Sequence, residues 1–546
     1  MMASILKNKT TTLLGILFSI TSMIGWVYCS YPENDFVFYS PYKFLFLASV
    51  LLCFFCGYKV ILSFGFYALK IAGKRYCGTD SRKSVSYMLF DKAPFRVFLI
   101  VSCIIYGFWW VAFFPGTLHP DMTHHLYQGL GIMPLNENVP IFLTKFVGFI
   151  MTLAKVYFLD DNVGVMIYVS GSLLLQCFTV GYLFFIFRKA KTPYFIRWFA
   201  CIYVYVLPVM AVWGVNFGKD TPYYIFLLLF VCALADILVT YDMHTTVNWF
   251  GALIMTLAGV GASWCRNNGS AIIIISLVVA AVCCTKRLRV IMIGCCMTCI
   301  VILYGFDLFV SSHYDVAPSP IRESYSIPLQ TYVSYLREYI NEIDENEAEM
   351  IRDMFSVDPV ELIAVYNPKI SDPVKNQFCS YPSDDQLKRF WSCYIKAFAN
   401  HPKVFIRGLF RHIYGYFYPG QECYADRIAI YTLNYLDDYY SFRYVWDGSS
   451  LREKMIGYSE GVYHLPIVRY LYRPGTQMLL LISLFAYAVS GKNKRKACLF
   501  VPSLLMVFVI FSPVCAYFRY MLPVFVALPI NMAWAVYTAD TASNTL

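Results

Sequence analysis

The stretch PYYIFLLLFVCALADILVTY, residues 222–241, decides the class of fold. It is apolar almost throughout and long enough to cross a lipid bilayer as one helix, which takes about 20 residues. Similar runs recur along the chain of 546 residues, of which 59% are apolar and only 14% are charged. Ordinary soluble domains carry about 25% charged residues, and a single soluble core could not bury this much apolar surface. The sequence therefore excludes a cytosolic enzyme, a disordered protein and a β-barrel porin.

Twelve apolar segments are expected to cross the membrane as helices, so the fold class is an all-α polytopic membrane protein. The first apolar run follows Lys7 and Lys9, as in a signal peptide. It is about 20 residues long and no cleavage site follows it, so we interpret it as an uncleaved span. The expected spans are 11–30, 43–70, 97–114, 162–187, 194–215, 222–241, 246–264, 270–285, 289–310, 476–490, 497–513 and 516–536.

Basic residues between the spans predict which side of the membrane each loop faces, because cytoplasmic loops carry an excess of Lys and Arg. With a cytoplasmic N-terminus, four basic clusters and the C-terminus are all cytoplasmic. This topology requires the apolar segment 139–158 to lie along the outer interface instead of crossing. The net charge of +10 then reflects cytoplasmic loops and not a nucleic-acid partner. The clusters are Lys74, Arg75, Arg82, Lys83 and Lys92; Arg188, Lys189 and Lys191; Lys286, Arg287 and Arg289; and Lys492, Lys494, Arg495 and Lys496.

Two loops on the expected outer side are far larger than the others. Residues 115–161 form the first, within a transmembrane part that covers 1–310. Residues 311–475 form the second, which we expect to fold as a small, mainly helical extracytoplasmic domain before the C-terminal helices of 476–546. Its stretch 386–418 has the pattern of an amphipathic helix at the headgroup level, which would anchor the domain or contact a lipid phosphate.

Most of the 19 cysteines lie in apolar runs, where Cys behaves as a small apolar residue. Three of them, Cys379, Cys393 and Cys423, fall in the polar second loop. Spacing alone leaves a disulfide among these three open.

Five polar segments interrupt the apolar pattern, and the expected topology places all of them at the outer membrane boundary. An ionisable residue costs about 2.5–3.5 kcal/mol at the bilayer centre and less near its surface, so its position along a span is informative. Arginine on the outer side runs against the usual distribution and implies an anionic partner. The segments are 115–121 (PGTLHPD), 218–222 (GKDTP), 266–269 (RNNG), 322–330 (RESYSIPLQ) with 371–375 (SDPVK), and 512–513 (SP) with 519–523 (RYMLP).

Each of these segments also has a purely structural interpretation. The turn at Asp121 fits an Asx turn, and the segment at Arg266 fits a helix cap. Lys219 and Asp220 fit a mutually neutralised pair at a helix end. Their shared side is more informative, because cations that hold phosphate and a carboxylate that handles a proton suit an anionic, lipid-borne substrate.

Histidines close to Asp121 raise the alternative of a bound metal ion. His119, His124 and His125 form a cluster that could bind a divalent metal as a cofactor. Their order matches no specific metal motif, so no cofactor is predicted with certainty.

The ordered set of segments resembles the GT-C membrane glycosyltransferases, which include protein mannosyltransferases, aminoarabinose transferases and oligosaccharyltransferases. In those families a catalytic Asp in the first outer loop precedes a membrane-lying helix, as 115–121 precedes 139–158 here. The set PG…D, GKD, RNNG, IPLQ, DPVK and SP…RY is similar to that of a family of uncharacterised bacterial membrane proteins with GT-C-like architecture, over roughly residues 95–525. GT-C families usually carry acidic pairs in the first loop. Asp121 has histidine neighbours instead, which leaves metal use and the identity of the base open.

The resemblance implies a multi-pass glycosyltransferase of the bacterial cell membrane with an extracytoplasmic active site. It would move a sugar from a polyprenyl-phosphate-linked donor to a glycan, lipid or protein acceptor, with Asp121 as general base on the acceptor hydroxyl. The sequence agrees in one respect, since it has no G-x-G-x-x-G motif at a strand–helix junction to bind a sugar nucleotide. The expected substrate-binding residues are Arg266, Arg519 and Lys219 for the phosphate, Asn267, Asn268 and Gln330 for the sugar, and Asp372 and Lys375 for the acceptor side, while Asp220 would orient Lys219 or bind sugar hydroxyls.

Three alternatives stay open at this point. A transporter or flippase of lipid-linked glycans would be expected to show repeated halves, and no convincing internal repeat is present. A polymerase or ligase of lipid-linked glycans would use much the same residues. A scaffold or receptor would leave the outer arginines unexplained.

Overall fold

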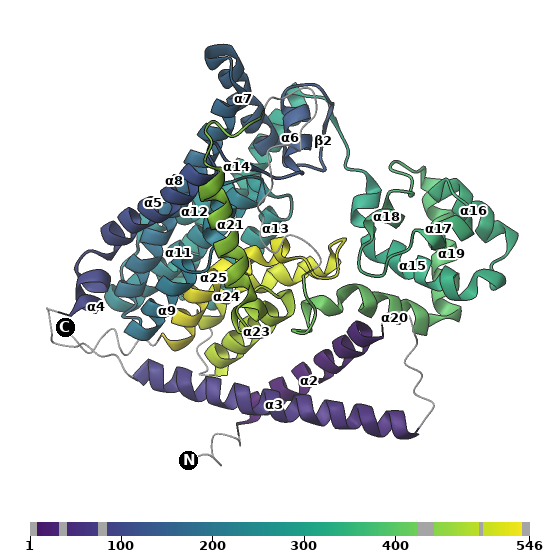
Figure 1. The fold of residues 1–546 in the computed structure, drawn as a ribbon, viewed down its shortest axis with the longest axis horizontal. Coiled ribbons are helices and arrows are strands. Elements are labelled where there is room, and N and C mark those ends of the chain that lie inside the picture. The colour runs from purple at the N-terminus through teal and green to yellow at the C-terminus, as the bar shows by residue number, and fades with distance from the viewer. Residues whose placement is uncertain (1–7, 32–40, 75–83, 424–441, 491–494, 538–546) are drawn as a thin grey trace.

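The computed structural model describes residues 8–31, 41–74, 84–423, 442–490 and 495–537. Nearly all elements are helices, and each strand has two residues (Figure 1). The part before the domain expected at 311–475, called the outer domain after its expected side, contains α2 (Lys9–Ser30), α3 (Pro41–Lys74), α4 (Val85–Tyr87), η1 (Met88–Lys92), α5 (Pro94–Ala112), β1 (Thr117–Leu118), α6 (Met122–Gly129), β2 (Leu135–Asn136), α7 (Ile141–Phe158), α8 (Asp161–Lys189), α9 (Tyr194–Tyr205), α10 (Val209–Gly214), β3 (Asn216–Phe217), α11 (Asp220–His244), α12 (Trp249–Cys265), α13 (Gly269–Cys283) and α14 (Lys286–His313). The rest contains β4 (Val316–Ala317), η2 (Ile321–Ser324), α15 (Ser326–Tyr339), η3 (Ile340–Glu342), α16 (Glu345–Phe355), α17 (Pro359–Ala364), α18 (Asp372–Lys375), α19 (Asp384–Asn400), α20 (Pro402–Ile413), η4 (Tyr414–Tyr416), α21 (Ser449–His464), α22 (Val468–Leu471), α23 (Pro474–Ser490), α24 (Arg495–Leu505), η6 (Met506–Phe511) and α25 (Phe518–Val536).

Eight helices in these ranges are long and apolar enough to cross a membrane: α2, α3, α5, α7, α8, α11, α14 and α25. All of them except α7 coincide with expected spans, and the shorter apolar helices α12, α13 and α23 lie at three further ones. The chain is therefore an almost entirely helical protein whose apolar helices indicate a multi-pass membrane protein. The interfacial position expected for 139–158 stays a prediction, because α7 has the length and composition of a span.

Two expected spans are interrupted. The segment 194–215 divides into α9 and α10, with Pro208 between them. Proline disfavours helical geometry in the residue before it, so a helix tends to end there. The segment 497–513 passes from α24 into the short turns of η6, and Pro502 lies inside α24. Both are apolar in composition but do not form one continuous helix.

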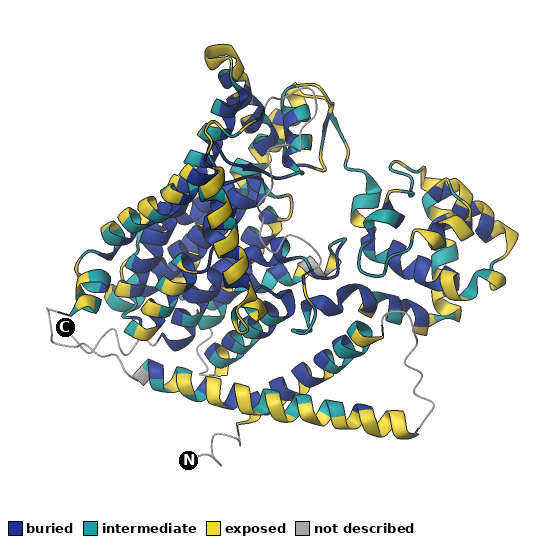
Figure 2. Ribbon diagram, in the orientation of Figure 1, coloured by how far each residue is buried: buried dark blue, intermediate teal, exposed yellow. Residues whose placement is uncertain are grey.

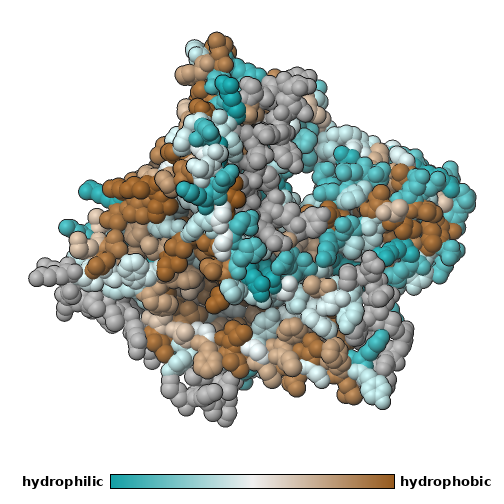
Figure 3. Space-filling view, viewed as in Figure 1, coloured by the Kyte–Doolittle hydropathy of each residue, from teal (hydrophilic) through white to brown (hydrophobic). Residues whose placement is uncertain are grey.

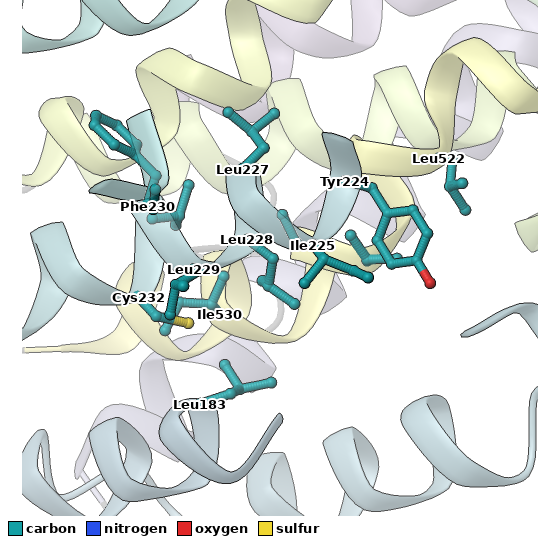
Figure 4. Close-up of a cluster of buried hydrophobic side chains, with 14 of the residues drawn as sticks. Leu183, Tyr224, Ile225, Leu227, Leu228, Leu229, Phe230, Cys232, Leu522 and Ile530 are labelled. Carbon is teal, nitrogen blue, oxygen red and sulfur yellow. The ribbon is translucent and has the colours of Figure 1, made fainter. Parts of the chain in front are cut away.

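The core of the bundle lies around α11, which is buried on all sides (Figure 2). A helix that is apolar all round is stable only when other helices surround it. Figure 4 shows Leu183 of α8, Ile225 of α11 and Ile530 of α25 among the buried apolar side chains of this centre. In Figure 3 apolar surface is prominent over the bundle, whereas hydrophilic surface is prominent on the domain around α15 to α19.

Ion pairs gather at the two ends of the bundle. Lys189 pairs with Asp236, and Arg495 lies 2.9 Å from Asp242, both toward the C-terminal end of α11. Asp220 begins the same helix at its other end, next to the candidate arginines. The basic clusters of Lys189 and Arg495 therefore lie opposite to the candidate site. The side that faces the cytoplasm stays a prediction, and the cluster members Arg75, Arg82, Lys83, Lys492 and Lys494 lie outside the described residues.

The outer domain has a separate hydrophobic core that extends from Leu329 in α15 to Phe405 in α20. Residues later in the expected 311–475 domain, such as Tyr416 and Tyr472, pack into the transmembrane core instead. The compact domain is therefore shorter than the loop that contains it. The expected helix 386–418 is divided into α19 and α20 where Pro402 begins the second helix. Cys379, Cys393 and Cys423 form no disulfide with one another, so the bridge that the spacing left open is absent among these three residues.

The outer domain is attached to the strand-like segment that leads into α25. Ser371 N–H donates to Pro513 O at 2.8 Å, and Cys515 N–H donates to Lys369 O at 2.9 Å. His412 adds a contact of 2.8 Å between Nε2 and Ser512 O. These bonds fix the backbone immediately before Arg519, so the outer domain helps to position that side chain.

Candidate functional site

A short parallel strand pair brings the first outer loop against the start of α11. Thr117 of β1 pairs with Asn216 of β3, and His119 N–H donates to Phe217 O at 3.1 Å. Gly116 allows this approach, because a Cβ there would lie 2.8 Å from a methyl carbon of Val169. The loop that carries Asp121 is thereby held beside the GKD segment, although about 100 residues separate them in the sequence.

Five of the residues expected from the sequence form one continuous ion network. Asp121 Oδ2 lies 3.1 Å from Lys219 Nζ and 3.1 Å from Arg519 Nη1. Asp220 Oδ1 lies 3.3 Å from Arg266 Nη1, and Asp220 Oδ2 lies 3.6 Å from Arg519 Nε. Arg519 therefore bridges the two carboxylates, from a position about 400 residues away from Asp121 in the sequence.

Asp121 is the most accessible member of this network. Its side chain is 30% exposed, against 8% for Arg519 and 4% for Asp220. Burial would raise the pKa of the Asp121 carboxyl, but the charges of Lys219 and Arg519 outweigh it and hold the pKa well below its usual value. Asp121 is thus a carboxylate whose proton affinity is suppressed as long as both cations contact it.

Tyrosine rings pack against the guanidinium groups of Arg519 and Arg266. Arg519 lies 4.7 Å from the ring centre of Tyr517 and 5.1 Å from that of Tyr520. Arg266 lies 5.2 Å from the same Tyr520 ring and 5.4 Å from that of Tyr223. Cations within about 6 Å of a ring face are attracted by its quadrupole. Tyr520 therefore couples the two arginines, and both are preorganised before any ligand arrives.

A cavity of about 430 Å³ adjoins the network. Lys219 and Arg266 line it together with Asn267 and Asn268, all four of which were expected from the sequence. The amide of Asn267 also donates to Glu137 O at 2.8 Å, which fastens the first loop to the rim. Other walls come from the outer domain and from the connection between α24 and α25, through residues that include Glu323, Ser324, Phe508, Phe511 and Tyr520.

An apolar groove of about 650 Å³ opens beside this cavity, between α7, α8, α11 and α12. Phe142 and Trp264 stack in its wall with ring centres 3.9 Å apart. Cys265 lines the groove, while its neighbour Arg266 lines the polar cavity. Sequence neighbours thus line an apolar and a polar space, an arrangement that suits a molecule with a long apolar tail and an anionic head.

Gln330 does not reach the cavity, contrary to its expected role in binding the sugar. Its side chain is fully buried in the outer domain, and Nε2 donates to Asn367 O at 3.1 Å and to Ile370 O at 2.6 Å. The amide thus satisfies backbone carbonyls of a loop. Lys375 and Asp372 also lie outside the lining, but Lys375 Nζ is 2.8 Å from the cavity residue Glu323 and 3.0 Å from Asp372.

The three histidines near Asp121 do not fit a metal centre. His119 Nε2 lies 2.7 Å from Arg519 Nη1 and accepts from it, because a guanidinium can only donate. His125 Nδ1 lies 2.8 Å from Thr144 Oγ1, and His124 is exposed. Across the part of the chain that the structure describes, no group of three or more His, Cys, Asp or Glu residues is placed to hold a metal ion.

Acidification should destabilise the protein through His125. Burial lowers the pKa of this side chain to about 3, with a further contribution from Lys219, whereas a histidine in an unfolded chain titrates near 6.5. Because the unfolded state binds the proton first, this contribution is complete above about pH 6.5 and falls by about 2 kcal/mol between pH 7 and pH 5. Denaturant unfolding in detergent at the two pH values measures the difference.

His125→Gln should remove most of that pH dependence, and His124→Gln at the exposed neighbour should leave it unchanged. An equal loss of stability on acidification in wild type and His125→Gln would show that another group is responsible.

Several site residues carry no role in the sequence interpretation. Glu323 and Tyr520 stand inside the segments RESYSIPLQ and RYMLP, but nothing in their spacing distinguishes them. His119 was considered only as a metal ligand, and its contact with Arg519 depends on the tertiary fold. An acidic residue beside an outer arginine, as in Arg322-Glu323, is the one signal that could have singled out Glu323.

Comparison with known proteins finds a match to DUF6020, described as a family of unknown function, over residues 131–545. The matched part includes Lys219, Arg266 and Arg519, and it begins ten residues after Asp121. No curated protein and no solved structure matches the chain.

Proposed function

The chain belongs to DUF6020, a family of unknown function, and we propose that it is a GT-C-type glycosyltransferase that takes a sugar from a polyprenyl-phosphate-linked donor. The observation that carries the proposal is the ion network of Asp121, Lys219, Asp220, Arg266 and Arg519, two of which line a polar cavity, together with an apolar groove that begins at the neighbouring Cys265. We further propose that the site faces the outside of a bacterial cell membrane and that both termini are cytoplasmic.

The two spaces match the two halves of such a donor. Lys219 and Arg266 line the polar cavity and would hold the phosphate, the arginine in a bidentate manner. The prenyl chain would lie in the groove beside Phe142 and Trp264. Transfer of the chain from water or lipid into this apolar groove costs little free energy. The amides of Asn267 and Asn268 are then close enough in the cavity to bind sugar hydroxyls.

Binding of the phosphate would also activate Asp121. Lys219 and Arg519 contact the same carboxylate oxygen, so a phosphate that attracts these cations competes with Asp121 for them. Its proton affinity then rises, because the charges that suppress it are shared with the ligand. The base would thus become effective only when the donor is in place.

The transfer step then balances in atoms and charge. The acceptor oxygen forms a bond to the anomeric carbon, and the bond between that carbon and the phosphate oxygen breaks. The acceptor proton moves to Asp121, a contribution of typically about 10²–10⁴-fold. The leaving phosphate gains one negative charge, which Lys219, Arg266 and Arg519 stabilise.

A flippase for lipid-linked glycans is the second candidate, and one observation favours it. Transporters often build their sites from interrupted helices, and the chain is interrupted between α9 and α10 and between α24 and η6. Both interruptions are followed closely by network residues, Lys219 after β3 and Arg519 after η6. A polymerase or ligase of lipid-linked glycans is a closer variant, since it would use the same groups on a larger acceptor.

Reconstitution separates these functions. Proteoliposomes with the full chain would be supplied with radiolabelled polyprenyl phosphosugars and with glycan, lipid and peptide acceptors, without a transmembrane gradient. The proposal predicts a new glycosidic bond and release of polyprenyl phosphate. Movement of the lipid between leaflets without a new bond would identify a flippase. If neither bond formation nor lipid movement occurs, the result indicates a binding protein.

A further inference from the structure

The network carries one positive charge in excess. Among the described residues that it joins, the cations are Lys219, Arg266 and Arg519, and the carboxylates are Asp121 and Asp220. We count His119 as a neutral imidazole, because a proton on its Nε2 would meet the N–H of Arg519 at 2.7 Å. These groups are largely buried, and a charge left uncompensated in such surroundings is costly. The best ligand for the network is therefore one whose charge is −1.

The lining of the cavity also contains a carboxylate. Glu323 is the only carboxylate among the described residues that line the cavity. Lys375 Nζ holds its Oε2 at 2.8 Å, while Oε1 is 3.7 Å from Arg322 Nε, too far for a hydrogen bond. Lys375 is itself only 8% exposed and is shared with Asp372 at 3.0 Å, so Glu323 has a rigid support from the outer domain.

We propose that the site accepts donors joined through a single phosphate, and that Glu323 is the specificity-determining residue that disfavours diphosphate-linked lipids. A sugar phosphodiester of a polyprenol carries one negative charge, which the network neutralises. The corresponding diphosphate carries a second charge, which would have no cation left in the network and would share the cavity with the carboxylate of Glu323. This inference rests on the proposed function, because it presupposes a lipid-linked phosphosugar in this cavity.

The charge of the network and that of a single phosphate stay matched during the reaction. When Asp121 takes up the acceptor proton, the excess positive charge of the network rises to two. The leaving polyprenyl phosphate gains its second negative charge in the same step. A single phosphate thus stays matched from substrate to product, whereas a diphosphate is mismatched throughout.

Binding of two matched lipids tests the proposal. The full chain in nanodiscs would be titrated with polyprenyl phosphoglucose and with polyprenyl diphosphoglucose of the same chain length. We expect wild type to bind the monophosphate about tenfold more tightly, and Glu323→Gln to reduce that ratio to about threefold or less by improving diphosphate binding.

Glu338→Gln is a matched control, since Glu338 is also 28% exposed and paired with an arginine, 3.1 Å from Arg407, but lies outside the cavity lining. It should keep the wild-type ratio. Equal or tighter diphosphate binding by wild type would overturn the inference without any variant, and so would an unchanged ratio in Glu323→Gln. Binding of both lipids without preference leaves the proposed function intact, whereas binding of neither would contradict both.

Discussion

Asp121→Asn should reduce sugar transfer by about 10²–10⁴-fold while polyprenyl phosphate binding is kept or strengthened. The amide has nearly the shape of the carboxylate but cannot accept the acceptor proton. It also ceases to compete for Lys219 and Arg519, each 3.1 Å from Asp121 Oδ2, so both cations become more available to a phosphate. Transfer in proteoliposomes and lipid binding in nanodiscs, measured on the same preparation, separate the two effects.

Glu137→Gln serves as the control for Asp121→Asn, because Glu137 is the next carboxylate in the first loop and is exposed. It should keep both activity and lipid binding. Full transfer activity in Asp121→Asn would remove Asp121 from the chemistry. Loss of lipid binding together with activity would instead indicate that Asp121 acts by holding the network together.

Arg519→Ala should weaken polyprenyl phosphate binding and lower the free energy of unfolding by about 3–5 kcal/mol. Arg519 contacts both Asp121 and Asp220, and its removal leaves the latter, 4% exposed, with Arg266 as its only partner in the network. Arg519→Lys keeps the charge but not the planar guanidinium, which contacts Asp121 through Nη1 and Asp220 through Nε, so its stability loss should be smaller while lipid binding still falls by about tenfold. Denaturant unfolding and nanodisc binding give the two quantities.

Asp220→Asn combined with Arg519→Ala should recover part of the stability, because it removes one of the carboxylates left behind. Arg407→Lys, at an ion pair outside the site, provides the control for replacing an ion-paired arginine by lysine. Unchanged lipid binding in Arg519→Lys and Arg519→Ala would reduce Arg519 to a structural ion pair at the membrane boundary.

The class of fold could be read from the sequence because the length and polarity of an apolar run are local properties. Residues 222–241 are an example, since their composition alone requires a buried helix, and α11 is the centre of the core. The cost of charge near a bilayer likewise pointed to Asp121, Arg266 and Arg519, which the fold brings into one network.

What could not be predicted depends on tertiary packing. The sequence does not predict that β1 pairs with β3, which places Asp121 beside Lys219. Glu323 and Gln330 belong to one polar segment, and the sequence does not show which of them reaches the site. In the structure Glu323 lines the cavity, whereas Gln330 is buried and donates hydrogen bonds to backbone carbonyls. Prolines within apolar runs, such as Pro208, interrupt spans that hydropathy alone would join.

The most direct test of the central claim is a structure of the full chain in lipid nanodiscs with polyprenyl phosphoglucose bound. The account predicts phosphate density within hydrogen-bonding distance of Lys219 and Arg266, with the prenyl chain along the groove at Phe142. Phosphate density at the opposite end of the bundle, beside Lys189 and Arg495, would contradict it.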